Sequence, residues 1–286
     1  GTGPYKLVEY QSGSYLKFEA NENYYKGEPS VKNIVFQIIE NADTAILALQ
    51  NGEVDAYQMT PQQVKKLDLD ASNLTAYSYT EGRVGYLQIN CNRVTDENVR
   101  KALLFAMDRK AMDDAAFESD EYYSIPYTFL PTNSQFYTED GVEKYEQDVD
   151  KAKSMLEEAG VSGLKLKLGY ISSDAVQSAQ ALLIQEQLKE VGVTVELAGG
   201  DGTAIANAMK DPDNEYDMYL GGYIMGIDPD TFSSLFENDG AYNYMHYSGY
   251  DTIDQLFEEG RSELDESARK ETYAKLQAAV QDTGAF

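Results

Sequence analysis

Alternating hydrophobic and polar positions predict short strands in the first part of the chain. Residues 5–19 alternate around a Gln-Ser-Gly-Ser turn, which predicts a β-hairpin. A run rich in β-branched residues, 31–39, predicts a further strand, and Asp43 is expected to cap a helix that runs to about residue 50. Residues 54–59 predict another short strand, followed by a helix that Pro61 begins.

Helical and strand periods alternate through the rest of the chain. Residues 74–89 predict extended segments interrupted at Glu81-Gly82, whereas 122–137, rich in Pro and Tyr, lacks periodicity and predicts a loop over the surface. The unit of strand 164–170, helix 174–191 and strand 193–197 predicts an α/β fold with a parallel or mixed sheet. Further elements are expected at 96–105, from 109, at 148–160, 203–209, 216–223, 251–263 and 266–280.

Composition limits the classes of function. The chain has 286 residues, 42% of them apolar, which is enough for two lobes, and we predict a division into 1–82 and 83–286. Its 49 acidic and 23 basic residues give a net charge of −26, which excludes nucleic acid as a partner because that partner needs a basic patch. Cys91 stands alone, so there is no disulfide framework, and no apolar run approaches the ~18 residues of a membrane span.

An ordered series of short motifs runs through most of the chain. It comprises 1–7 (GTGPYKL), 18–21 (FEAN), 49–56 (LQNGEVDA), 86–90 (YLQIN), 98–103 (NVRKAL), 106–109 (AMDR), 150–160 (DKAKSMLEEAG), 228–230 (DPD) and 246–251 (HYSGYD). In this order and spacing the motifs resemble the solute-binding proteins of peptide-type ABC importers, extracellular solute-binding family 5. Each motif alone is weak, and the set is specific.

The resemblance implies a periplasmic-binding-protein-like two-lobed fold of class II, in which 83–286 is the second lobe and 1–82 an incomplete first lobe. It implies an extracytoplasmic receptor, periplasmic or lipid-anchored at the cell surface, that captures oligopeptides and delivers them to an ABC permease and its ATPase. No enzymatic activity and no cofactor are expected. Family members are longer, so we expect a fragment that lacks the N-terminal part and the C-terminal end, where a strand would return to the first lobe.

The residues themselves point to the loop after strand 216–223 as a ligand site, because ligands of open α/β sheets lie beyond the carboxyl ends of strands. Glycines 221 and 222 would let a ligand backbone approach, and the amides of 222–226 would pair with an extended peptide. The alternative is that the two glycines only mark a strand end and a tight turn. The candidate ligand-binding residues here are Gly222, Tyr223, Ile224, Met225, Gly226 and Asp228.

By resemblance, Gly222-Tyr223 stands where many peptide receptors have Gly-Trp, and Tyr223 would supply an aromatic wall. Three residues later those receptors carry an aspartate that neutralises the amino terminus of the peptide, and this chain has Gly226. Asp228 is a candidate substitute, or the ligand has a blocked amine or is not a peptide. Alternatively, Asp228 caps a helix that Pro229 starts.

Five further residues are candidates for ligand contact. Tyr57, Gln58 and Met59 match family positions that face the cleft, where they would stack, hydrogen-bond and adapt to varied side chains. Tyr79 and Tyr86 flank Gly82 and Gly85, a predicted hinge, and would line the cleft floor. Core packing or loop solvation is the alternative for all five.

Rival functions have weaker signals. The 23 tyrosines keep an oligosaccharide ligand open, and the family also includes relatives for sugars, nickel chelates and haem. A carbohydrate- or peptide-acting hydrolase is the alternative of another class, although no carboxylate spacing singles out an acid pair. Residues 199–203 (GGDGT) resemble a phosphate-binding turn, yet no Lys or Arg follows until Lys210, so a turn with Asp201 as a helix cap is favoured. His246 is the sole histidine, so packing is favoured over catalysis.

Overall fold

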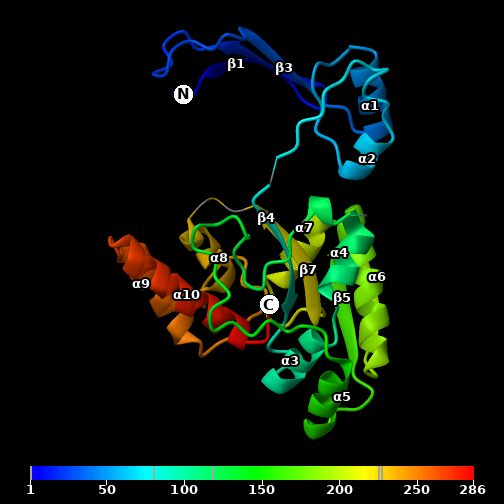
Figure 1. Ribbon diagram of the computed structural model, residues 1–286, viewed down its shortest axis with the longest axis vertical. Coiled ribbons are helices and arrows are strands. Elements are labelled where there is room, and N and C mark those ends of the chain that lie inside the picture. The colour runs from blue at the N-terminus through cyan, green and yellow to red at the C-terminus, as the bar shows by residue number, and fades with distance from the viewer. Residues whose placement is uncertain (1, 80, 118, 225, 227) are drawn as a thin grey trace. The chain divides into compact units, whose positions relative to one another are not determined.

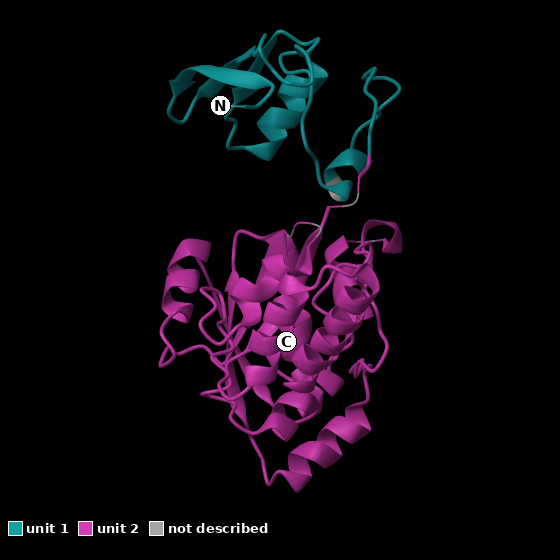
Figure 2. Ribbon diagram, turned by 90° about the vertical axis from the view of Figure 1, so that its left-hand side faces the viewer, with its two compact units in different colours: residues 1–77 teal, residues 78–286 magenta. Residues whose placement is uncertain are grey.

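The computed structural model describes residues 2–79, 81–117, 119–224, 226 and 228–286. The chain forms two compact units, Gly1–Tyr77 and Ser78–Phe286, coloured separately in Figure 2. This division falls before the predicted boundary at residue 82. The fold is mixed α/β, and each unit has its own sheet.

Unit 1 is built on the predicted hairpin. Strands β1 (Tyr5–Gln11), β2 (Tyr15–Ala20) and β3 (Asn33–Gln37) form an antiparallel sheet in that order, and Gly13 supplies the positive φ of 71° in the first turn. Helix α1 (Ala42–Gln50) begins two residues earlier than predicted, since its cap is Asn41, whose side chain accepts from the amide of Thr44. Asp43 instead lies in the first turn, where its charge favours the helix dipole.

The predicted strand over Val54–Met59 is wrong, because these residues form turns and irregular backbone. The three-stranded sheet of unit 1 ends at β3, so no described strand pairs with them, and an isolated apolar run cannot form a strand without a partner. The helix at Pro61 is confirmed as α2 (Pro61–Lys65), which Thr60 and Gln63 close with a reciprocal capping box.

Unit 2 contains a four-stranded mixed sheet in the order β4-β7-β5-β6. Its strands are β4 (Arg83–Ile89), β5 (Lys165–Ile171), β6 (Thr194–Gly200) and β7 (Met218–Ile224). β5 is parallel to β6 and β7, as the strand–helix–strand pattern predicts, and β4 is antiparallel to β7. The carboxyl ends of β5, β6 and β7 and the start of β4 therefore share one edge, called here the carboxyl edge. Of the extended stretch predicted over 74–89, only β4 is a strand.

Helices cover both faces of this sheet (Figure 1). One face packs on α3 (Glu97–Phe105), α5 (Val149–Glu158) and α6 (Ala175–Glu190), and α4 (Arg109–Phe117) lies against α6. The other face packs on α8 (Ser233–Phe236), α9 (Asp251–Ser262) and α10 (Glu266–Asp282), with α7 (Gly202–Met209) beside them. Two short 3-10 helices, Asp120–Tyr122 and Pro229–Phe232, complete the unit. The predicted helices are thus confirmed, with Asp96, Asp148 and Asp174 as caps.

The segment 122–137 is irregular as predicted, but it does not run over the surface. Thr128, Phe129, Leu130 and Phe136 are all buried, and Phe129 is 0% exposed. The ring of Phe129 lies 4.9 Å from that of Phe236, so the segment fills the core beneath α8–α10. An apolar residue in a loop gives no periodic signal, which is why the pattern along the chain missed it.

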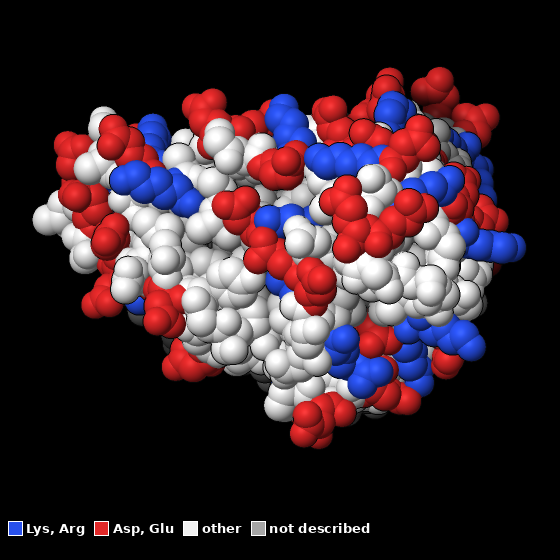
Figure 3. Space-filling view, turned by 90° about the horizontal axis from the view of Figure 1, so that it is seen from below, with Lys and Arg blue, Asp and Glu red and all other residues white. Residues whose placement is uncertain are grey.

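The surface reflects the acidic composition. Figure 3 shows acidic side chains spread over the face that it presents, with basic side chains between them. Many basic groups are engaged in ion pairs with acidic neighbours, such as Lys110 with Asp114 at 2.6 Å. None of the helices among the described residues is both long and apolar enough to cross a membrane.

Candidate functional site

Strand β7 is only half paired at the carboxyl edge. It pairs with β4 along its whole length, from Met218 to Ile224. Its pairing with β5 is confined to Met218 and Tyr219, so from Leu220 onward the described strands pair with β7 on one side only. Leu220 and Gly221 are buried, Gly222 and Tyr223 are half-buried and Ile224 is exposed, so the part of this side that a ligand can reach lies at the end of the strand. A strand end that lacks a partner on one side is the kind of place where β-augmentation adds an extended chain.

Gly221 and Gly222 lie inside β7 and not in a turn, so the alternative interpretation of these two glycines is wrong. A Cβ on Gly221 would lie 2.4 Å from Cε2 of Tyr86, and one on Gly222 would lie 2.7 Å from Nε of Arg83. Both side chains come from β4 and cross over β7 on opposite faces of the sheet. A side chain at position 221 would therefore collide with the ring of Tyr86, and one at position 222 would push the guanidinium of Arg83 aside.

The residues after Gly222 become progressively exposed. The half-buried ring of Tyr223 packs 5.8 Å from that of Tyr242, Ile224 is 64% exposed, and Gly226 is exposed. Met225 lies outside the described residues. This exposure suits contact with a ligand, and ligand contact by these residues stays a prediction.

Asp228 has the structural role that the sequence offered as an alternative. Its side chain caps the 3-10 helix by accepting from the amide of Asp230, and both its carboxylate oxygens accept from Nη2 of Arg269, at 2.8 and 2.7 Å. Arg269 also donates through Nε to the carbonyl of Gly260, which ties the loop after β7 to α9 and α10. The carboxylate of Asp228 therefore already has a cationic partner.

Arg83 is a residue of the carboxyl edge that the sequence did not single out. It begins β4, pairs in register with Ile224, and its side chain is 43% exposed. Its Nη2 lies 3.4 Å from Oδ2 of Asp174, the residue that caps α6. The only available signal was an arginine at a strand start, which is uninformative until the pairing with the glycines of β7 is known.

The other predicted residues belong to elements other than β7. Tyr57, Gln58 and Met59 lie on irregular backbone of unit 1 immediately before α2, where Tyr57 is 37% exposed and Met59 is half-buried. Tyr79 is 68% exposed, and Gly85 lies inside β4 opposite Gly222. A role of these side chains in ligand binding, and of the glycines in a hinge, stays a prediction.

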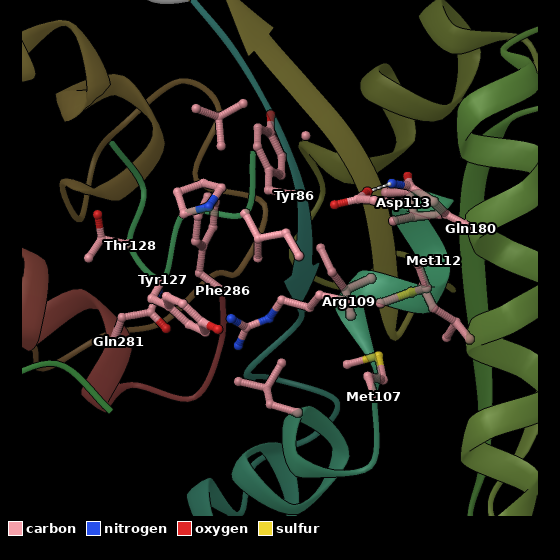
Figure 4. A pocket seen from close by; sticks show the side chains of 18 residues that line it. Tyr86, Met107, Arg109, Met112, Asp113, Tyr127, Thr128, Gln180, Gln281 and Phe286 are labelled. Atoms are coloured by element: carbon pink, nitrogen blue, oxygen red, sulfur yellow. Dashed lines mark hydrogen bonds between the residues drawn. The ribbon is translucent and has the colours of Figure 1, made fainter. Parts of the chain in front are cut away.

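Tyr86 lines a cavity of about 150 Å³ beside the edge strand β4, shown in Figure 4. Its ring centroid lies 5.1 Å from that of Phe286, and burial raises the pKa of its hydroxyl well above the usual range. Across the cavity, Asp113 accepts from Nε2 of Gln180 at 3.1 Å, and burial, the largest effect, raises the pKa of Asp113 to about 6. Sites for small molecules usually enclose roughly 300–1,000 Å³, so this cavity is too small for an oligopeptide.

The rival signals have structural explanations. Nε2 of His246 donates to the carbonyl of Met209 at 2.8 Å, and His246 has a φ of 49°. Asp201 caps α7 by accepting from the amide of Ala204, as predicted by the alternative in which this residue is a helix cap. Among the described residues, no group of three or more His, Cys, Asp or Glu side chains is arranged so that it could hold a metal ion.

The family model of bacterial extracellular solute-binding proteins, family 5 (middle), matches residues 1–244. The chain belongs to this family. Its α/β fold is that of the two-lobed binding proteins: the substrate-binding protein CtaP from Listeria monocytogenes has a TM-score of 0.88 at 37% identity, over 100% of this chain and 59% of that one. The family is one of solute-binding proteins and not of enzymes.

Two further relatives differ in what they bind. The oligopeptide-binding protein AppA from Bacillus subtilis, solved with a nonapeptide, has a TM-score of 0.79 at 25% identity over 98% of this chain and 58% of that one. The nickel-binding periplasmic protein of Escherichia coli is 26% identical over 74% of this chain and 43% of its own length. The chain spans about half the length of the curated relatives it matches, 53 or 54%.

Proposed function

We propose that this chain is part of an extracytoplasmic receptor that captures oligopeptides and hands them to the permease of an ABC importer. The observation that carries the proposal is the half-paired strand β7. From Leu220 to Ile224 the described strands pair with it on one side only, and its last residue, Ile224, and the following Gly226 are exposed. A peptide held through its backbone is recognised almost independently of its sequence.

The glycines contribute to this surface indirectly. Because Gly221 and Gly222 have no side chains, the side chains of Tyr86 and Arg83 approach the backbone of β7 closely. Tyr223, supported by Tyr242, then supplies an aromatic surface at the carboxyl edge. We further propose that Tyr57, Gln58 and Met59 of unit 1, and Tyr79, contact the same solute.

A non-peptide solute is the second candidate, and one observation favours it. Gly226 leaves no carboxylate three residues after Tyr223, and Asp228 is already paired with Arg269. Burying an ammonium group without a counter-ion costs several kcal/mol, so binding a peptide with its free amino terminus at this position is unfavourable. An oligosaccharide or a peptide with a blocked amine avoids that cost.

The test is binding by the complete protein purified from its host. Native mass spectrometry would be run with a library of random five-residue peptides and, separately, with cellopentaose. The proposal expects peptide adducts of many sequences and no sugar adduct. A sugar adduct alone, or hydrolysis of either probe, would refute it.

A matched set of peptides tests whether the ligand backbone pairs with β7. A bound peptide would be compared by calorimetry with the same peptide N-methylated at alternate residues. Removing backbone donors that pair with β7 is expected to weaken binding at least tenfold in one of the two methylation registers, because each lost hydrogen bond leaves a carbonyl without its partner. Equal binding by both registers and the parent peptide would exclude strand addition.

A further inference from the structure

Arg83 is held in place at the carboxyl edge by the backbone of its neighbour. Its guanidinium lies across Gly222, where a Cβ would be 2.7 Å from Nε and 2.8 Å from Nη2. The strand register places Gly85 opposite Gly222 and Arg83 opposite Ile224, so the side chain runs along the last pairs of the sheet. Any side chain at position 222 would displace it.

The guanidinium is only partly neutralised by the protein. Its contact with Asp174 is long, 3.4 Å, and Oδ1 of Asp174 already accepts from the amides of Val176 and Gln177 at the start of α6. Among the described residues, no other hydrogen bond or ion pair of Arg83 was found. With 43% of the side chain exposed, the remaining N–H groups of its fork can reach a ligand.

Two acidic groups that follow β7 are in the opposite state. Asp228 is paired with Arg269 at 2.7 Å, and Asp230 with Arg261 at 2.8 Å. These two carboxylates are therefore occupied by arginines of α9 and α10, while the arginine at the start of β4 keeps donors available.

We propose that Arg83 binds a carboxylate of the solute, so that unit 2 recognises an anionic group and does not require a free ammonium. The inference rests on the proposed function and deepens it. A guanidinium donates two parallel hydrogen bonds to a carboxylate, which gives both affinity and orientation. In an oligopeptide the carboxylate is either the C-terminus or an acidic side chain, and both have the same chemistry.

The experiment uses the complete protein and the random five-residue peptide library in four forms: both ends free, N-acetylated, C-terminally amidated, and blocked at both ends. Wild-type protein is compared with Arg83→Gln, Arg83→Lys and the control Lys110→Gln, which removes the same charge from an exposed side chain of α4. Thermal unfolding checks that the variants are folded. Native mass spectrometry identifies the bound sequences, and calorimetry measures their affinities.

Acetylation is expected to change wild-type affinity less than threefold, and amidation to lower it at least tenfold. Arg83→Gln should bind the free acids at least tenfold more weakly than wild type and the amides as well as wild type does. The affinity of Arg83→Lys for the free acids should lie between the two, and Lys110→Gln should match wild type. A second outcome also supports the proposal: among amidated peptides, only those that contain Asp or Glu bind, and Arg83→Gln abolishes this preference. The carboxylate is then that of a side chain. Equal binding of acids and neutral amides by wild type, or loss of binding on acetylation, overturns it.

Failure of the proposed function gives a different result. If no peptide binds in any form, the peptide assignment fails, and the solute that copurifies from the host is identified by mass spectrometry for wild type and Arg83→Gln. An anionic solute that the variant loses still supports Arg83 as the carboxylate-binding residue. A neutral or cationic solute, or an anionic one that the variant retains, overturns it.

Discussion

Replacing Arg100 should be among the most damaging single changes in unit 2. This arginine is 3% exposed and makes no ion pair among the described residues. Its guanidinium donates to three backbone carbonyls: that of Thr283 from Nε at 3.1 Å and Nη2 at 2.8 Å, and those of Val94 and Thr95 from Nη1 at 3.0 Å each. Nη2 also donates to the hydroxyl of Tyr250 at 3.3 Å. One side chain thus joins the start of α3 to the segment after α10.

The expected cost follows from the acceptors left behind. Each buried carbonyl without a donor costs about 1–3 kcal/mol, and three are affected. Removing the charge returns part of its desolvation cost, so Arg100→Met should lower the free energy of unfolding by about 3–5 kcal/mol. Arg100→Lys keeps the charge, but its single nitrogen cannot span both groups of carbonyls, and we expect about half that loss.

Urea unfolding followed by far-ultraviolet circular dichroism measures these values, with Lys110→Met as the matched control. Lys110 makes an exposed pair with Asp114 on one helix, worth about 0.3–0.5 kcal/mol, and a long contact of 3.5 Å with the exposed hydroxyl of Tyr123. Hydrogen exchange adds a local readout, because the amide of Ile89 donates to the carbonyl of Ala285, two residues after Thr283, and should lose protection. A loss below about 1 kcal/mol for Arg100→Met, similar to that of the control, would refute the reasoning.

Three further predictions follow from burial. Phe129→Ala should lower the free energy of unfolding in urea by about 3–5 kcal/mol, because the ring is 0% exposed. Tyr122→Ala, in the same stretch of chain, should lower it by less than about 1 kcal/mol. Equal effects would contradict the core role of the segment. Burial raises the pKa of Asp113 to about 6, so the unfolded chain binds fewer protons than the folded one between about pH 4 and 6, and stability falls as pH rises through that window. Asp113→Asn should therefore gain about 1 kcal/mol on wild type from pH 4 to 7, and a constant difference across that range would be the contrary result. Burial also raises the pKa of the Cys91 thiol to about 11, so its alkylation by iodoacetamide at pH 8 should be at least tenfold slower in native than in urea-unfolded protein, and similar rates would disagree.

Local signals predicted most elements of unit 2 because they act within a few residues. Asp148 caps its helix through an amide three positions away, as the sequence predicts, and Asp96 and Asp174 cap helices that the pattern places at these residues. In unit 1, Pro61 begins α2 as predicted. Where the prediction failed, the deciding contact was distant in the chain: residues 54–59 have no described partner strand, and Phe129 packs on rings about 100 residues later.

The candidate site shows the same limit. The motif that includes Gly221 and Gly222 located the correct strand, but what the glycines accommodate depends on the pairing of β7 with β4, far away in sequence. Arg83 was missed for that reason. Asp228 had two interpretations in the sequence, and only the position of Arg269 on α10 decides which group its carboxylate faces.

The central claim is that solute adds to the open side of β7 at the carboxyl edge of unit 2. Hydrogen–deuterium exchange of the complete protein, with and without the random five-residue peptide library, tests it most directly. The account predicts slower exchange on binding for amides within 220–226, while those of Leu168 and Gly169, where β5 is paired on both sides, stay unchanged. Slower exchange confined to the cavity beside Tyr86 and Asp113, with 220–226 unaffected, would contradict it.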